Sequence, residues 1–87
     1  MTIPLLPDRD GDCTENLRLA LRDVHDEPLA IDLERVPYLT SGALTELAKF
    51  RRAHREGSIV LRHPNALVLR TLHICGFNKL FAIENAA

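Results

Sequence analysis

The sequence predicts a single α/β domain, residues 1–87, in which helices cover a small, mixed but mainly parallel β-sheet. Two observations predict this class. Short apolar runs alternate with longer amphipathic segments in the order β-α-β-α-β-α-β, and no linker or internal repeat divides the chain. The composition agrees, because 46% hydrophobic and 26% charged residues are typical of a soluble globular domain rather than a disordered one.

The N-terminal part predicts an edge strand, a turn and a helix. Thr2–Leu6 has strand character, but Pro4 removes a ladder donor and favours the edge of a sheet. Pro7–Gly11 has the composition of a turn. Asp12 resembles a helix N-cap, with Glu15 three residues later as in a capping box. The apolar face of the helix that follows consists of Leu17, Ala20, Leu21 and Val24.

The middle of the chain predicts a buried strand and a second helix. Leu29–Leu33 is a mostly apolar run that indicates a buried, parallel strand. The helix is expected from Ser41 to about Glu56, and Gly57 is the natural residue to end it. Its apolar stripe consists of Ala43, Leu47 and Phe50, widened by Leu44 and Ala48.

The C-terminal part predicts a strand, a third helix and a last extended segment. The strand is Ser58–Arg62, whose branched residues favour that structure. The helix starts near Pro64–Asn65 and is closed by Gly76, before an extended segment at Phe77–Ile83. Its apolar face consists of Val68, Leu69 and Leu72, extended by Leu67 and Ile74.

Charge and hydropathy exclude several classes of protein. The net charge is −1, from 11 basic and 12 acidic residues, whereas a nucleic-acid binder usually has a basic excess. No run reaches the roughly 18 apolar residues of a membrane span, and the N-terminus does not resemble a signal peptide. We therefore expect a cytoplasmic protein without direct membrane insertion, with Cys13 and Cys75 reduced and Cys75 buried. A local basic run, interpreted as a solvated helix face, consists of Lys49, Arg51, Arg52 and Arg55.

Motifs of catalysis and metal binding are missing from the sequence. It contains no phosphate-binding glycine loop, no nucleophile elbow and no Cys-x-x-Cys pair. None of the four histidines, His25, His54, His63 and His73, has the spacing of a metal ligand. We expect a binding module with no enzymatic activity, no metal and no cofactor.

The most informative segment is the turn Thr40-Ser41-Gly42-Ala43, which opens the second helix. A helix start presents unpaired N–H groups and a field that favours negative charge. A phosphate on Ser41 would meet those donors and add about two negative charges. Simple N-capping by Thr40 or Ser41 is the alternative interpretation. Asp32, at the end of a buried strand, either caps a loop or joins a surface site.

Around this turn the chain resembles the STAS domain, the fold of bacterial anti-sigma-factor antagonists. The family pattern v-D-L-s-x-V-x-y-L-D-S-x-G-L aligns with residues 31–44. The family then has a helix ending in glycine, a strand, and a helix ending in t-G-l. Here the corresponding segments are Arg55-Glu56-Gly57, Ile59-Val60-Leu61 and Leu72–Phe77. The resemblance covers about residues 29–83, and the usual first strand is reduced.

The resemblance implies regulation by phosphorylation. In the anti-sigma branch, a GHKL-type serine kinase that is also the anti-sigma factor phosphorylates the serine after the aspartate. Only the unphosphorylated domain captures that kinase and so controls transcription. By position this serine is Ser41, with Thr40 and Thr45 as secondary candidates. The implied partner-binding residues are Asp32, Thr40, Ser41, Gly42, Ala43 and Leu44.

Two departures from the pattern point to a second branch. Thr40 replaces the family's aspartate, and Ala43 replaces its glycine. The resulting Thr-Ser-Gly-Ala is similar to the STAS accessory subunit of phospholipid-transport ABC systems, which docks on the ATPase subunit. The alternative partner is therefore an ABC ATPase. A weak homodimer through the edge strand Thr2–Leu6 is also compatible with the sequence.

Overall fold

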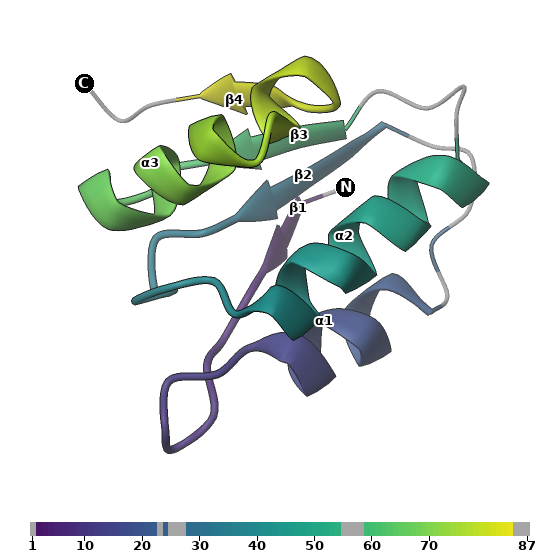
Figure 1. The fold of residues 1–87 in the computed structure, drawn as a ribbon. Coiled ribbons are helices and arrows are strands. Elements are labelled where there is room, and N and C mark those ends of the chain that lie inside the picture. Colours follow the sequence, from purple (N-terminus) through teal and green to yellow (C-terminus); the bar gives the residue numbers. More distant parts are fainter. Residues whose placement is uncertain (1, 23, 25–27, 55–58, 85–87) are drawn as a thin grey trace.

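A computed structural model describes residues 2–22, 24, 28–54 and 59–84. Its elements follow one another in strict alternation (Figure 1). They are β1 (Thr2–Pro4), α1 (Thr14–Leu21), β2 (Leu29–Asp32), α2 (Ser41–Ala53), β3 (Ile59–Arg62), α3 (Ala66–Ile74), a 3₁₀ turn η1 (Phe77–Lys79) and β4 (Ala82–Glu84). The predicted order of strands and helices is thus confirmed. Gly57, Ser58 and Arg55 lie outside the described residues.

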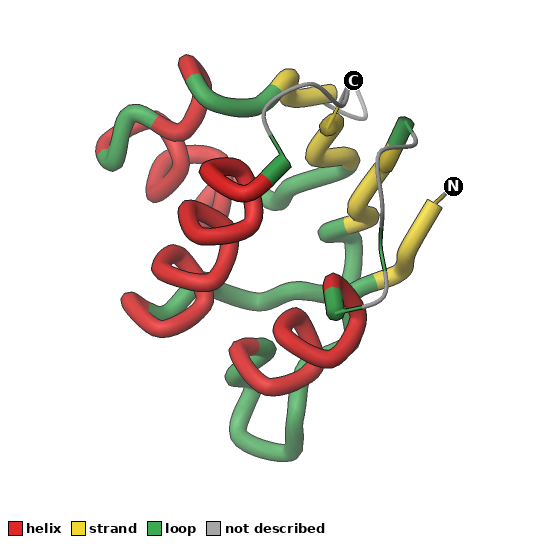
Figure 2. The backbone as a smooth tube through the Cα atoms, turned by 90° about the vertical axis from the view of Figure 1, so that its right-hand side faces the viewer, coloured by secondary structure: helices red, strands yellow, loops and turns green. Residues whose placement is uncertain are grey.

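The four strands form a parallel sheet in the order β1-β2-β3-β4. Each crossover joins neighbouring strands, so crossovers of the usual right hand place every helix on the same face. Figure 2 shows this arrangement, with the helices on one side and the strands on the other. Pro4 lies on the edge strand β1, as predicted, where its missing N–H leaves no gap in the ladder.

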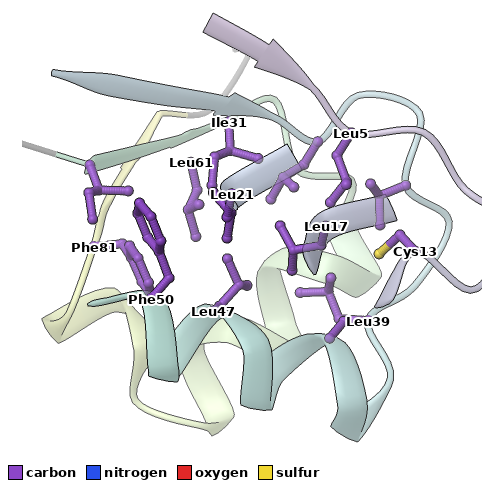
Figure 3. Close-up of a cluster of buried hydrophobic side chains, with 14 of the residues drawn as sticks. Leu5, Cys13, Leu17, Leu21, Ile31, Leu39, Leu47, Phe50, Leu61 and Phe81 are labelled. Atoms are coloured by element: carbon purple, nitrogen blue, oxygen red, sulfur yellow. The ribbon is translucent and has the colours of Figure 1, made fainter. Parts of the chain in front are cut away.

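The core lies between the sheet and the helices. In β2, Leu29 and Ile31 are buried while Ala30 and Asp32 are half-buried, and β3 repeats this alternation. Both strands are therefore covered on one face only, whereas the sequence predicted a buried strand. Aliphatic and aromatic side chains from the sheet, the helices and the loops fill the core (Figure 3).

Helix α1 starts differently from the prediction. Its N-cap is Cys13, not Asp12, and Cys13 makes no side-chain capping bond. The Glu15 carboxylate pairs with Arg18 one turn further along, so it does not complete a capping box. Instead the carboxylate of Asp12 accepts the backbone N–H of Thr14 at 3.0 Å. Asp12 therefore precedes the N-cap residue, and from that position its carboxylate accepts the N–H of the first helical residue.

Helix α3 buries a narrower face than predicted. Val68 and Leu72 are buried, but Leu67 is 57% and Ile74 74% exposed. Cys75, predicted to be a small buried residue, is exposed as well. Because α3 spans only nine residues and α2 does not pack closely against its flank, only one stripe of side chains reaches the core. Gly76 ends the helix as predicted, in the left-handed conformation with φ +76°.

The last predicted extended segment is only partly a strand. Phe77 and Phe81 are buried against the core, and a 3₁₀ turn between them brings both rings inward, with centroids 5.9 Å apart. β4 begins only at Ala82. The two aromatic side chains explain the shortening, because an extended chain cannot bury residues four apart as closely as a turn does.

Candidate functional site

The predicted turn lies where β2 leads into α2. Thr40 is the N-cap of α2, with extended backbone, and its side-chain oxygen accepts the backbone N–H of Ala43 at 3.1 Å. Its carbonyl accepts the N–H of Leu44 at 3.0 Å. N-capping by Thr40, one of the two expected interpretations, is therefore present in the structure.

The side chain of Thr40 also reaches the start of α1. Its hydroxyl lies 2.9 Å from the hydroxyl of Thr14 and 3.2 Å from the Asp12 carboxylate. The Thr14 hydroxyl donates to the same carboxylate at 2.7 Å. These three side chains, which we call the capping triad, join the first turns of α1 and α2. Thr40 occupies the position of the family's aspartate, and the capping triad places the carboxylate of Asp12 beside it.

The protons of the capping triad can be assigned. Each hydroxyl has one proton to give. Thr14 gives its proton to Asp12, and Thr40 gives its own to Thr14 or to Asp12 while accepting from Ala43. The hydrogen bonds that Thr14 and Thr40 donate to Asp12 are accepted by one oxygen of its carboxylate, and they favour its ionised form. Hydrogen bonds from the Thr14 hydroxyl and N–H, with a further one from Thr40, accordingly lower the pKa of Asp12.

The hydroxyls proposed as phosphate acceptors differ in their surroundings. Thr40 is engaged in the capping triad, and the Thr45 hydroxyl donates to the carbonyl of Ser41 at 2.8 Å. Ser41, the first residue of α2, is exposed, and its hydroxyl makes no hydrogen bond with the described residues. Of the three, Ser41 is the hydroxyl most accessible to a reacting group.

The remaining residues of the turn have structural roles. Gly42 packs against Thr14, and a Cβ at this position would lie 3.1 Å from two atoms of that side chain. Ala43 is fully buried, so its side chain belongs to the core and cannot contact a partner. Leu44 is half-buried against the core, with part of its surface exposed. The accessible part of the predicted surface therefore reduces to Ser41, Gly42 and Leu44 with the edge of Thr40.

Asp32 lies apart from this surface. The alternation along β2 directs its side chain to the sheet face that the helices leave uncovered. There its carboxylate accepts the N–H of Glu34 at 3.0 Å. Of the two interpretations of Asp32 from the sequence, its contacts therefore support loop capping.

Two residues that the sequence did not single out hold the loop before α2. Asn65, the N-cap of α3, donates to the carbonyls of Val36 and Pro37 at 3.2 and 3.3 Å. The Tyr38 hydroxyl donates to the carbonyl of Asp10 at 2.7 Å, over Gly11. A sequence can indicate that Asn65 caps a helix. It does not indicate the contacts of Asn65 and Tyr38 with residues 28 or more positions away.

Cys13 is the thiol next to this site. Cys13 lies below the capping triad, and burial, with the nearby charge of Asp12, raises the pKa of its thiol. The described ranges contain no group of three or more potential ligands arranged around a metal. In the same ranges, no helix has the length and apolar character needed to cross a membrane.

Comparison with known proteins identifies the family. The model of the STAS domain matches residues 9–86. A solved structure from Thermotoga maritima, described as a "putative anti-sigma factor antagonist", superposes with a TM-score of 0.69 at 21% identity. The match covers 95% of this chain and 74% of that one, and at this identity it demonstrates the fold. No curated protein matches the chain. Because the family model spans nearly the whole sequence, the chain belongs to the STAS domain family.

Proposed function

We propose that this STAS domain is a non-catalytic regulatory module of the anti-sigma-factor-antagonist type. Its partner would be an anti-sigma factor that is also a serine kinase of the GHKL class, in the bacterial cytoplasm. The unmodified domain binds the partner through the first turn of α2, and phosphate on Ser41 releases it. This cycle would control transcription by freeing a sigma factor.

The accessibility of Ser41 carries this proposal. Its hydroxyl stands exposed at the start of α2, whereas the hydroxyls of Thr40 and Thr45 are engaged with Ala43 and Ser41. A kinase needs a hydroxyl that can approach the γ-phosphate without first breaking hydrogen bonds. The description of the Thermotoga maritima structure is consistent with this class of function.

The electrostatics of the turn support release by phosphorylation. The ionised Asp12 already places one negative charge beside Thr40. Phosphate on Ser41 would add about two more, on a surface whose accessible residues are otherwise uncharged. A partner that has desolvated the unmodified turn would then face a buried, unpaired charge, and its affinity would fall.

Phosphorylation with a defined kinase tests the proposal. The protein is incubated with ATP and a GHKL-type anti-sigma kinase from the same genome, and the modified residue is located by mass spectrometry. We expect one phosphate on Ser41 and none in Ser41→Ala, while the control Thr45→Ala is still modified. In binding assays Ser41→Asp should weaken kinase binding by about tenfold or more, and Ser41→Ala should preserve it.

Two results would contradict the proposal. One is the absence of phosphate on Ser41, Thr40 and Thr45 under conditions in which the kinase modifies another substrate. The other is equal affinity of Ser41→Asp and Ser41→Ala for the kinase. Both variants should unfold at the same urea concentration as the wild type, because Ser41 is exposed and makes no hydrogen bond with the described residues.

The second candidate is an accessory subunit of a phospholipid-transport ABC system. The observation that favours it is Thr40, which replaces the family's aspartate and is fixed within the capping triad. In this case the same turn docks on the ATPase subunit, and Ser41 stays unmodified. Co-purification with an ABC ATPase and not with a kinase would support this candidate over the first.

A further inference from the structure

Helix α2 has two flanks with different neighbours. It lies between α1 and α3 (Figure 1), and Gly42 faces α1, where it contacts Thr14. Ser41, Leu44, Ala48 and Arg51 recur at spacings of three and four residues, so they share the opposite flank, which faces α3. Arg52 borders the same flank at the C-terminal end of the helix.

A groove lies on this second flank near the C-terminal end of α2. It encloses about 380 Å³ and is lined, among the described residues, by Ala48, Arg51, Arg52 and Leu80. Leu80 follows η1 and is 42% exposed. The groove therefore combines an apolar floor with two guanidinium groups at one end.

Helix α3 is the neighbouring helix on this side of α2 (Figure 1). Leu67, Thr71 and Ile74 share one flank, because they are four and three residues apart. Val68 and Leu72 are buried and point toward the sheet. Because α3 is right-handed and runs antiparallel to the strands, the flank of Leu67, Thr71 and Ile74 then faces α2. Among the described residues, five large hydrophobic side chains are exposed. One of them, Leu80, lines the groove, and two others, Leu67 and Ile74, lie on the flank of α3 that faces α2. Such a concentration marks an interaction surface.

We propose that this groove, lined by Ala48, Arg51, Arg52 and Leu80 and flanked by Leu44, Leu67 and Ile74, binds an acidic amphipathic helix of a partner protein. The apolar residues match the apolar face of such a helix. The exposed guanidinium of Arg52 matches a carboxylate at one of its ends, and among the described residues no acidic side chain lines the groove. From Ser41 to Arg52 the flank is about 16 Å long, which corresponds to roughly three turns of a bound helix.

The groove and Ser41 lie on the same flank of α2, at opposite ends of the helix. In this respect the inference rests on the proposed function and deepens it. A phosphate on Ser41 would stand at the N-terminal end of this flank and repel an acidic segment that extends along it. Arg52 at the other end would set the direction in which that segment lies.

A peptide titration tests the groove without any kinase. The probe is a three-turn helical peptide with leucines at every third or fourth position and glutamates beside them. A matched peptide carries glutamine in place of glutamate. Isotope-labelled protein is titrated with each peptide and followed by NMR. We expect the glutamate peptide to bind at least about fivefold more tightly and to shift the amide signals of Ala48, Arg52 and Leu80.

Two pairs of variants localise the binding. Arg52→Glu should weaken the glutamate peptide by about fivefold, whereas Lys49→Glu should change its affinity less than about twofold. Lys49 is the matched control because it lies on the same helix, on the flank facing α1, and pairs with Glu46 at 3.9 Å. Ile74→Ser should weaken binding, and Leu19→Ser, a change at another exposed apolar residue, on α1, should not.

Three outcomes would overturn the inference. Equal effects of Arg52→Glu and Lys49→Glu on the affinity for the glutamate peptide would refute the groove. Failure of the peptide to bind saturably refutes it as well. Self-association of the wild type that Ile74→Ser abolishes would assign the groove to a second copy of the chain. Failure of Ser41 phosphorylation would leave peptide binding intact, so it would refute the proposed function alone.

Discussion

Helix α2 is held against α1 by close packing and a hydrogen-bonded triad, whereas its other flank borders an open groove beside α3. On the α1 side Gly42 packs on Thr14, and Asp12, Thr14 and Thr40 share their protons. On the α3 side Leu67, Ile74 and Leu80 remain exposed. The difference indicates that the first flank positions the turn of Ser41, and that the second is available to a partner.

The largest expected effect comes from adding volume to the closed flank. Gly42→Leu would force a side chain into Thr14, which cannot move without breaking the capping triad. We expect a loss of about 2–3 kcal/mol in the free energy of unfolding, measured by urea denaturation. Ala48→Leu on the open flank should change it by less than about 0.5 kcal/mol. Equal losses in the two variants would contradict the distinction between the flanks.

A smaller effect is expected from removing the hydroxyl of the N-cap residue of α2 while keeping the shape of its side chain. Thr40→Val deletes the acceptor for the N–H of Ala43 and the donor to Thr14 and Asp12. The expected loss is about 1–2 kcal/mol. Thr45→Val is the same chemical change on the same helix, at an exposed hydroxyl that donates to Ser41, and should cost less than about 0.5 kcal/mol. A Thr40→Val variant as stable as Thr45→Val would show that the capping triad does not hold the helices.

The order of elements and the start of α2 were predictable because each depends on local signals. The alternation of apolar runs gave the strands, and Thr40 and Ser41 stood where a helix needs a cap. The family resemblance then drew attention to Ser41 among the hydroxyls of the turn. These inferences needed only residues within about one helical turn of one another.

The contacts that distinguish the two flanks were not predictable in this way. Asp12 meets Thr40 across 28 residues, and neither residue alone indicates the other. Leu67 and Ile74 were assigned to the apolar face of α3, because periodicity identifies apolar residues but not whether an element covers them. Cys75 was misjudged for the same reason. Coverage depends on how closely α2 and α3 approach each other, which the pattern of apolar residues does not indicate.

The smallest expected effect is on the pH dependence of the free energy of unfolding, which tests the charge of Asp12 in the capping triad. Because hydrogen bonds from Thr14 and Thr40 lower the pKa of Asp12 below its ordinary value of 3.8, the folded state favours the ionised carboxylate. The resulting stability is fully present above that value and is lost as the pH falls through the lower pKa of the folded protein. Asp12→Asn should therefore be less stable than the wild type at pH 7, by less than Thr40→Val because the amide oxygen still accepts. Urea denaturation at pH 7 and at pH 3 should show this difference narrowing in acid. In a Thr40→Val background the substitution should have a smaller effect, since one donor to the carboxylate is already gone. A difference that stays constant with pH would mean that the charge of Asp12 does not stabilise the contact between α1 and α2.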